Sequence, residues 1–153
     1  MNGLENKSGT EPLIKIEHLK KYFDVPGKGE LHAVDDISLE IMPYETLGLV
    51  GESGCGKSTV GNVLTRLLDA TSGHAYFDGQ DIVTAKRGKM EEIRREIQMV
   101  FQDPYSSLNP KKTIRSILET PLKIHNIVKK EELGQKVEEL ADMVGLEKYV
   151  LDK

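Results

Sequence analysis

The sequence contains a single cysteine, so no disulfide can form within the chain, and this is typical of a reducing compartment. No apolar run approaches the roughly 18 residues that a membrane-spanning helix needs. Residues 1–12 have neither the basic start nor the apolar middle of a secretory signal. An excess of positive charge is also missing, because 21 basic residues face 25 acidic ones and the net charge is -4. We therefore expect a cytosolic chain that does not bind nucleic acid.

The residues that are present suffice for one domain of ordinary size, since 38% of the 153 residues are apolar. Residues 13–19 (LIKIEHL) and 36–41 (DISLEI) have strand character, and the second alternates apolar with polar side chains. Such alternation is typical of antiparallel strands with one solvated face. The segment 24–30 contains Pro and Gly and predicts an exposed loop, while residues 74–77 predict a strand before an Asp-Gly turn.

Two other segments are almost wholly apolar. Residues 46–50 (TLGLV) and 97–101 (IQMVF) predict strands buried on both faces, as in a parallel sheet covered by helices. Helices are predicted after Ser58 and near 88–95, and helical spacing continues beyond Pro104. The apolar stripe of the first helix consists of Val60, Val63, Leu64, Leu67 and Leu68. The stripe of the last helix consists of Leu133, Val137, Leu140, Ala141 and Val144, with Gly145 as its C-terminal cap.

Residues 51–58, GESGCGKS, match the pattern GxxxxGK[ST] between an apolar segment and a helix. The glycines let the backbone curl so that consecutive N–H groups point at phosphate oxygens, and the helix N-terminus adds partial positive charge. Lys57 is expected to reach the β and γ phosphates, and Ser58 to bind Mg²⁺ through its hydroxyl, with help from Thr59. Cys55 occupies a free position of the motif and is expected to have no redox role. The pattern predicts binding of a nucleoside triphosphate.

Three stretches together resemble the ATP-binding subunits of ABC transporters. Two of them are VGESGCGKSTV and IQMVFQDPYSSLNP. The third precedes both and runs from HLKKYF to LHAVDDISLEI. The resemblance extends from about residue 13 to the end. The closest likeness is to the branch that powers import of dipeptides and oligopeptides, with related nickel systems. It implies an α/β P-loop NTPase fold, the ABC-type nucleotide-binding domain, with an antiparallel β subdomain and the start of an α-helical subdomain.

The resemblance also implies a site for ATP and Mg²⁺. Gln102 matches the family's glutamine, whose neutral amide can bind Mg²⁺ and orient a water without repelling the γ-phosphate. Asp103 is a competing candidate as a Walker B acid, but Gln102 intervenes and Pro104 follows at once. Phe23 matches the aromatic residue that stacks on adenine, with Tyr22 as the alternative. The implied nucleotide-binding residues are Phe23, Gly51, Glu52, Ser53, Gly54, Cys55, Gly56, Lys57, Ser58, Thr59 and Gln102, with Lys57 and Gln102 catalytic and Ser58 and Gln102 binding the metal.

The resemblance implies three parts: a flexible tail at 1–12, a nucleotide-binding core at 13–103, and the beginning of a helical subdomain at 104–153. The segment PYSSLNP is expected to link the γ-phosphate to the surface that meets the membrane-embedded subunits. Tyr44 departs from the pattern, because the family usually has glycine in this turn.

Several catalytic elements of the family have no counterpart in this sequence: the signature sequence, the Walker B aspartate with its adjoining glutamate, and the switch histidine. We therefore expect the N-terminal portion of a longer ATPase subunit, which on its own binds nucleotide without turnover. Its implied partners are a second ATP-binding subunit, membrane-embedded permease subunits and, indirectly, a solute-binding protein, at the cytoplasmic face of the membrane. A small P-loop kinase is the alternative.

Overall fold

The computed structural model describes residues 11–103 and 107–153. The described residues fall into two compact units, divided between Met99 and Val100, and each is described by itself. Most of the predicted tail, 1–12, lies outside the described residues, as do the first three residues of the segment PYSSLNP.

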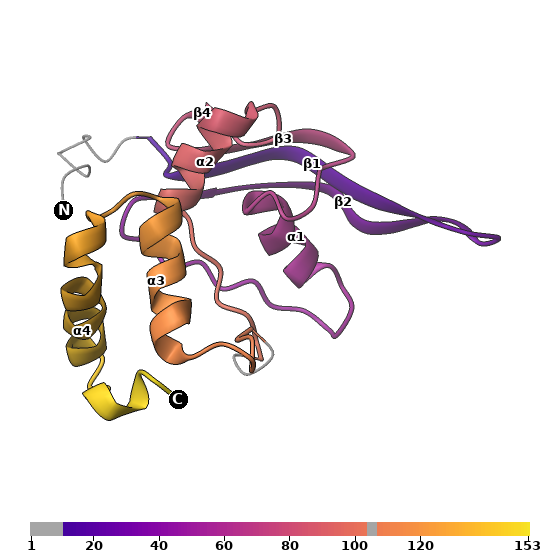
Figure 1. The fold of residues 1–153 in the computed structure, drawn as a ribbon. Helices are drawn as coiled ribbons and strands as arrows, with labels where there is room; N and C mark the ends of the chain where they lie inside the picture. The colour runs from indigo at the N-terminus through magenta and orange to yellow at the C-terminus, as the bar shows by residue number, and fades with distance from the viewer. Residues whose placement is uncertain (1–10, 104–106) are drawn as a thin grey trace. The chain divides into compact units, whose positions relative to one another are not determined.

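The first unit contains one antiparallel sheet of four strands in the order β2-β1-β3-β4 (Figure 1). The strands are β1 (Ile14–Val25), β2 (Gly29–Ile41), β3 (Ser72–Phe77) and β4 (Gln80–Asp81). The predicted strands at 13–19, 36–41 and 74–77 are confirmed. The loop predicted for 24–30 is shorter than expected, because β1 and β2 pair as far as Val25 and Gly29 and Lys28 N donates to Val25 O at 2.9 Å.

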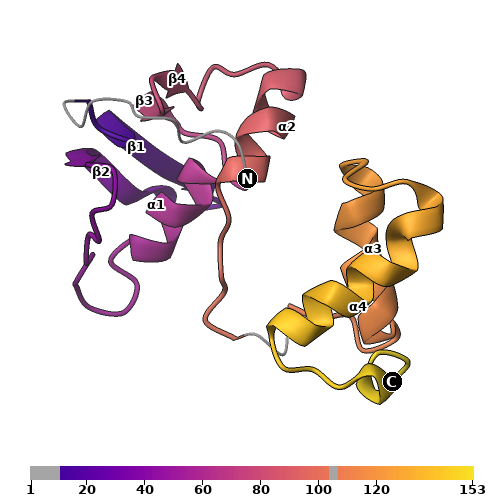
Figure 2. The ribbon, with the colours of Figure 1, turned by 90° about the vertical axis from the view of Figure 1, so that its left-hand side faces the viewer.

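Two helices complete this unit (Figure 2). Helix α1 (Lys57–Leu64) packs on the sheet, and α2 (Arg87–Glu96) packs on a smaller cluster that includes Ile82. The main core consists of Ile16, Leu19, Val34, Val60, Val63 and Ala75, all less than 9% exposed. Val60 and Val63 come from the predicted helical stripe, and their burial against three strands anchors the segment just before them.

Helix α1 is shorter than its apolar stripe predicts. It ends at Leu64, where Thr65 Oγ1 donates to Gly61 O at 3.0 Å and Arg66 takes a left-handed φ of 55°. Leu67 therefore lies outside the helix and is 55% exposed. Leu68 is also outside the helix but still packs against the main core.

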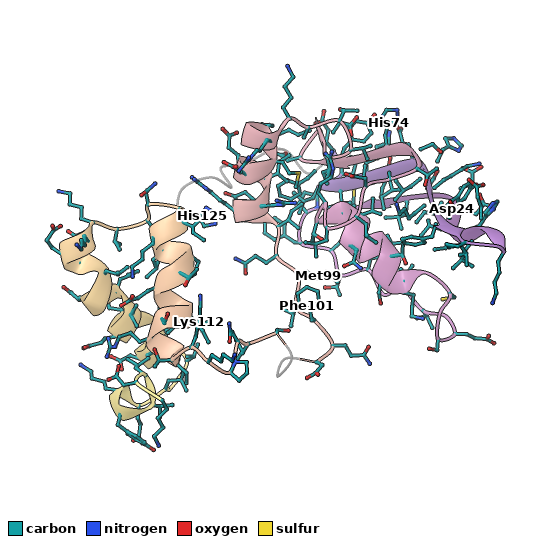
Figure 3. All side chains as sticks on the ribbon, turned by 45° about the vertical axis from the view of Figure 1, so that its right-hand side comes forward. Asp24, His74, Met99, Phe101, Lys112 and His125 are labelled. Carbon is teal, nitrogen blue, oxygen red and sulfur yellow. The ribbon has the colours of Figure 1, made fainter. Side chains whose placement is uncertain are left out.

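The predictions of strands at 46–50 and 97–101 are wrong. Neither segment is a strand, and the side chains of Leu47, Leu49, Val50, Val100 and Phe101 are each at least 43% exposed. An apolar run becomes a strand only if a neighbouring strand accepts its backbone hydrogen bonds. Within residues 11–103 and 107–153, all paired strands belong to the antiparallel sheet and none pairs with these two segments. Figure 3 shows Met99 and Phe101 on a segment outside any helix or strand.

A β-bulge in β2 brings the sheet against the start of α1. Lys21 pairs with Val34 and Tyr22 pairs with His32, so Ala33 has no partner on β1. Gly56 lies directly against this bulge, because a Cβ at Gly56 would be 2.1 Å from the carbonyl oxygen of Ala33. Only glycine therefore fits at the residue that precedes α1, because any side chain there would collide with the bulge.

The second unit is a pair of helices, α3 (Ile114–Ile124) and α4 (Leu133–Met143), with two short 3₁₀ segments, η1 (Lys130–Glu132) and η2 (Lys148–Val150). The predicted helical character beyond Pro104 is confirmed here. The core of this unit consists of Leu122, Leu133, Val137, Ala141 and Leu151. Gly145 follows α4 with a left-handed φ of 72°, in agreement with its predicted role as a cap.

We expect Gly56→Ala to destabilise the protein more than Gly54→Ala. Both glycines have left-handed φ values, 93° and 83°, so the backbone strain of an alanine is similar, roughly 1–2 kcal/mol. Only at Gly56 does the new methyl group also collide with Ala33, which adds about 1–3 kcal/mol of overpacking. Urea unfolding followed by circular dichroism measures both variants, and equal losses of stability would contradict the contact with the bulge.

Candidate functional site

The loop of residues 51–56 leads directly into the N-terminus of α1. Gly56 is the N-cap residue, and it has no side chain that could accept a hydrogen bond from this terminus. The N–H groups of a first helical turn have no partner within their helix, and the helix dipole places partial positive charge there. This end of α1 therefore has the donors and the charge that suit an anion, as predicted from the motif.

The side chain of Lys57 closes the loop on itself. Its Nζ donates to the carbonyl oxygens of Gly51 at 2.8 Å and Glu52 at 2.6 Å, and it lies 3.4 Å from the Sγ of Cys55. These contacts hold the ammonium group against the backbone of the loop. Three of the residues expected to contact phosphate, Gly51, Glu52 and Cys55, thus lie around one positive charge.

The interior of the loop is tightly filled. A Cβ at Gly51 would lie 2.6 Å from the Sγ of Cys55, so the thiol occupies the space that a side chain at Gly51 would need. Glu52, Ser53, Gly54 and Ser58 are exposed to solvent, while Thr59 is half-buried beside the buried Val60. Most of the loop and Ser58 are therefore accessible to a ligand from solvent.

Phe23 and Tyr22 lie on opposite faces of β1. Leu19 is fully buried in the core, and because side chains alternate along a strand, Lys21 and Phe23 follow it on the same face as the core. Lys21 Nζ lies 4.8 Å from the centroid of the Phe23 ring. Tyr22 lies on the other face. Of the two aromatic candidates, Phe23 is thus on the side of the sheet that carries α1.

Tyr22 is engaged in contacts of its own. Its ring stacks on His32 with centroids 3.8 Å apart, and its hydroxyl donates to Asp35 Oδ1. The hydrogen bond to Asp35 raises the pKa of Tyr22 to about 12 and lowers the pKa of Asp35. The sequence offered no signal for His32 or Asp35, since their position beside Tyr22 depends on the bulge at Ala33.

Gln102 belongs to the second unit and is exposed, as is Asp103, whose carbonyl oxygen accepts a hydrogen bond from Ser107 Oγ at 3.0 Å. The predicted metal ligands Ser58 and Gln102 offer a hydroxyl and an amide oxygen, which are the hard ligands that Mg²⁺ prefers. In the part of the chain that the structure describes, no three His, Cys, Asp or Glu residues gather into a metal site. The hydroxyl of Ser58 and the amide oxygen of Gln102 suit Mg²⁺, which takes most of its remaining ligands from phosphate and water.

Comparison with known proteins gives consistent results. The sequence model of the family described as "ABC transporter" matches residues 34–152. The chain is 50% identical over 141 residues to the oligopeptide transport ATP-binding protein OppF of Bacillus subtilis, covering 91% of this chain and 46% of the relative. It is 40% identical over 143 residues to the glutathione import ATP-binding protein GsiA of Pectobacterium atrosepticum, covering 90% of this chain and 23% of the relative. The chain thus spans less than half the length of these relatives.

Solved structures agree with this assignment. A dimeric ATP-binding cassette in a post-hydrolysis state, bound to ADP and Pi, matches with a TM-score of 0.76 and 27% identity over 91% of this chain and 60% of that chain. None of the helices described in the structure is long and apolar enough to cross a membrane. The predicted fold class, an ABC-type P-loop NTPase domain with an antiparallel β part and a helical part, is confirmed. The chain therefore belongs to the ABC transporter family.

Proposed function

We propose that this chain binds MgATP through residues 51–59 and forms part of a subunit that powers peptide import by ATP hydrolysis. The observation that carries the proposal is the loop between the bulge at Ala33 and the N-terminus of α1, with the Lys57 ammonium bonded to its carbonyl oxygens. Consecutive backbone N–H groups, a helix dipole and a lysine form the chemical environment that a polyphosphate requires.

Within this proposal each residue of the loop has a distinct role. The backbone of Gly51, Glu52, Ser53, Gly54, Cys55 and Gly56 surrounds the phosphates, Lys57 contacts the β and γ oxygens, and Ser58 binds Mg²⁺ with Thr59 beside it. Bound Mg²⁺ would bridge phosphate oxygens and neutralise their charge. Gln102 is proposed to bind the metal through its amide oxygen and to orient the attacking water. Phe23 is proposed to stack on the base, in agreement with its place on the α1 face of the sheet.

The transport role rests on the relatives, whose names describe oligopeptide and glutathione import. We infer that the whole subunit acts at the cytoplasmic face of the membrane with a second ATP-binding subunit, permease subunits and, indirectly, a solute-binding protein. Hydrolysis needs a carboxylate that positions the water, and these 153 residues contain no Walker B pair. On its own this chain is proposed to bind nucleotide without sustained turnover.

Lys57→Ala is expected to weaken MgATP binding by at least about tenfold, because a charge-assisted contact to phosphate is lost. Ser58→Ala should weaken MgATP binding more than binding of ATP in the presence of a chelator, since only the metal contact is removed. Lys89→Ala on α2 is the matched control, because it removes the same charge from a pair with Glu92 at 2.8 Å. Calorimetry measures all three, and unchanged affinity in Lys57→Ala would refute the proposed phosphate loop.

Phe23→Ala is expected to weaken ATP and GTP binding alike, by roughly 1–3 kcal/mol, since an aromatic face accepts either purine. Binding of inorganic triphosphate, which has no base, should not change. Competition titrations with the three ligands measure these effects. A loss at Tyr22→Ala without one at Phe23→Ala would assign the stacking to Tyr22.

Saturating MgATP is expected to slow the reaction of Cys55 with thiol reagents. Cys55 is the single, exposed cysteine, and its Sγ lies 3.4 Å from Lys57 Nζ, so bound phosphate would shield it. Labelling rates with and without nucleotide, read by mass spectrometry, test this directly. The Lys57→Ala chain is the control in which shielding should disappear, and equal rates in the unmodified chain would place the thiol away from the phosphates.

A further inference from the structure

Two arginines join α2 to the end of α1 that is opposite to the phosphate loop. The guanidinium of Arg94, in the last turn of α2, donates to Arg66 O at 2.8 Å and to Thr65 O at 3.4 Å. In return, Arg66 Nη1 donates to Ile82 O at 2.7 Å and to Ala85 O at 3.4 Å, in the segment that precedes α2. We call Arg66 and Arg94 the arginine clasp.

Arg66 stands at a position where the backbone favours glycine. After α1 the chain turns with two hydrogen bonds, from Arg66 N to Val63 O at 2.9 Å and from Leu67 N to Asn62 O at 2.8 Å. Arg66 itself has a left-handed φ of 55°. Glycine is the usual residue in such a helix end, because it has no Cβ to oppose a left-handed φ. A strained residue with side-chain bonds to another element indicates that the side chain has a task there.

The arginine clasp supplies what the end of α1 lacks. The last carbonyl groups of a helix have no partner within it, and a positive charge beside them is favourable. Helix α1 has no basic residue in its own last turn, so Arg94 of α2 provides this charge. Because α1 has only eight residues, the N–H groups of its last turn bond directly to the carbonyl groups of its first turn. Helix formation is cooperative, so a loosened last turn also loosens the first.

We propose that Arg94 and Arg66 are positioning residues for phosphate: by holding the C-terminal end of α1, they keep its N-terminal N–H groups and Lys57 in place for the phosphate oxygens. This inference rests on the proposed function, because the clasp affects a ligand only through the phosphate loop. The clasp lies at the other end of a helix roughly 12 Å long, so neither arginine touches the ligand itself.

The test combines calorimetric titrations of the full chain with urea unfolding, and its ligands are MgATP and the magnesium complex of inorganic triphosphate. Arg94→Gln removes the charge at the end of α1. Arg66→Gly removes the other side of the clasp and also relieves the strained φ. Each variant should bind both ligands about fivefold more weakly, as expected when a charge at a helix end is lost. The two ligands should weaken by the same factor, because they share only the phosphates.

Three further variants separate positioning from stability and from net charge. Arg94→Lys keeps the charge beside the carbonyl groups and should recover most of the lost affinity. Arg87→Gln is the matched control on the same helix, since it removes the same charge from a solvent-exposed pair with Glu91 at 3.2 Å. Ile93→Val removes a methyl group from the buried cluster beneath α2 and should lower the urea midpoint. Both controls should bind the two ligands as well as the unmodified chain does.

Four outcomes would overturn the positioning role: unchanged affinity in Arg94→Gln and Arg66→Gly, a loss for MgATP alone, no recovery in Arg94→Lys, or an equal loss in either control. If Arg94→Gln does not fold by circular dichroism, Arg66→Gly decides the question. An unmodified chain that binds neither ligand would refute the proposed function and the positioning role together. An unmodified chain that binds both, with unaffected clasp variants, would refute only the positioning role.

Discussion

The close approach of Gly56 to the carbonyl of Ala33 is the constraint on which the rest of the first unit depends. It joins the sheet, the phosphate loop and α1 at one point where no side chain fits. On one side of this point, Val60 and Val63 anchor α1 in the core; on the other, the bulge sets the register of β1 against β2. The loop proposed to bind phosphate is thus held at its end by a close contact between two backbone segments.

The two faces of the β1–β2 hairpin have different tasks. The inner face carries Leu19 and Val34 into the core and Phe23 beside Lys21, whereas the outer face carries the polar contacts of Tyr22. Adjacent residues of a strand point in opposite directions, so the two aromatic residues lie on different faces of β1.

The sequence predicted the turn of residues 51–56 and the start of α1, because glycine, lysine and hydroxyl residues at this spacing are typical of such a turn before a helix. It failed at 46–50 and 97–101, where apolar composition indicated burial but the hydrogen-bonding neighbours of a strand are not among the paired strands of the described residues. It left Tyr22 and Phe23 as alternatives, since only the register distinguishes their faces. Geometry explains why the family usually has glycine where this chain has Tyr44: the residue follows Pro43 in a turn closed by Glu45 N and Met42 O at 3.1 Å, and its φ of 65° is one that glycine adopts without strain.

The bulge in β2 has a consequence beyond the candidate nucleotide site. In the sheet of residues 11–103, β2 is an outer strand of 13 residues, long enough to recruit a strand from another molecule. Irregular pairing at Ala33 and the left-handed φ of 56° at Asp36 interrupt its ladder, so that its outer N–H and C=O groups do not form a regular row. The distortion that brings Ala33 to Gly56 thereby also protects the open border of the sheet against self-association through intermolecular β-pairing.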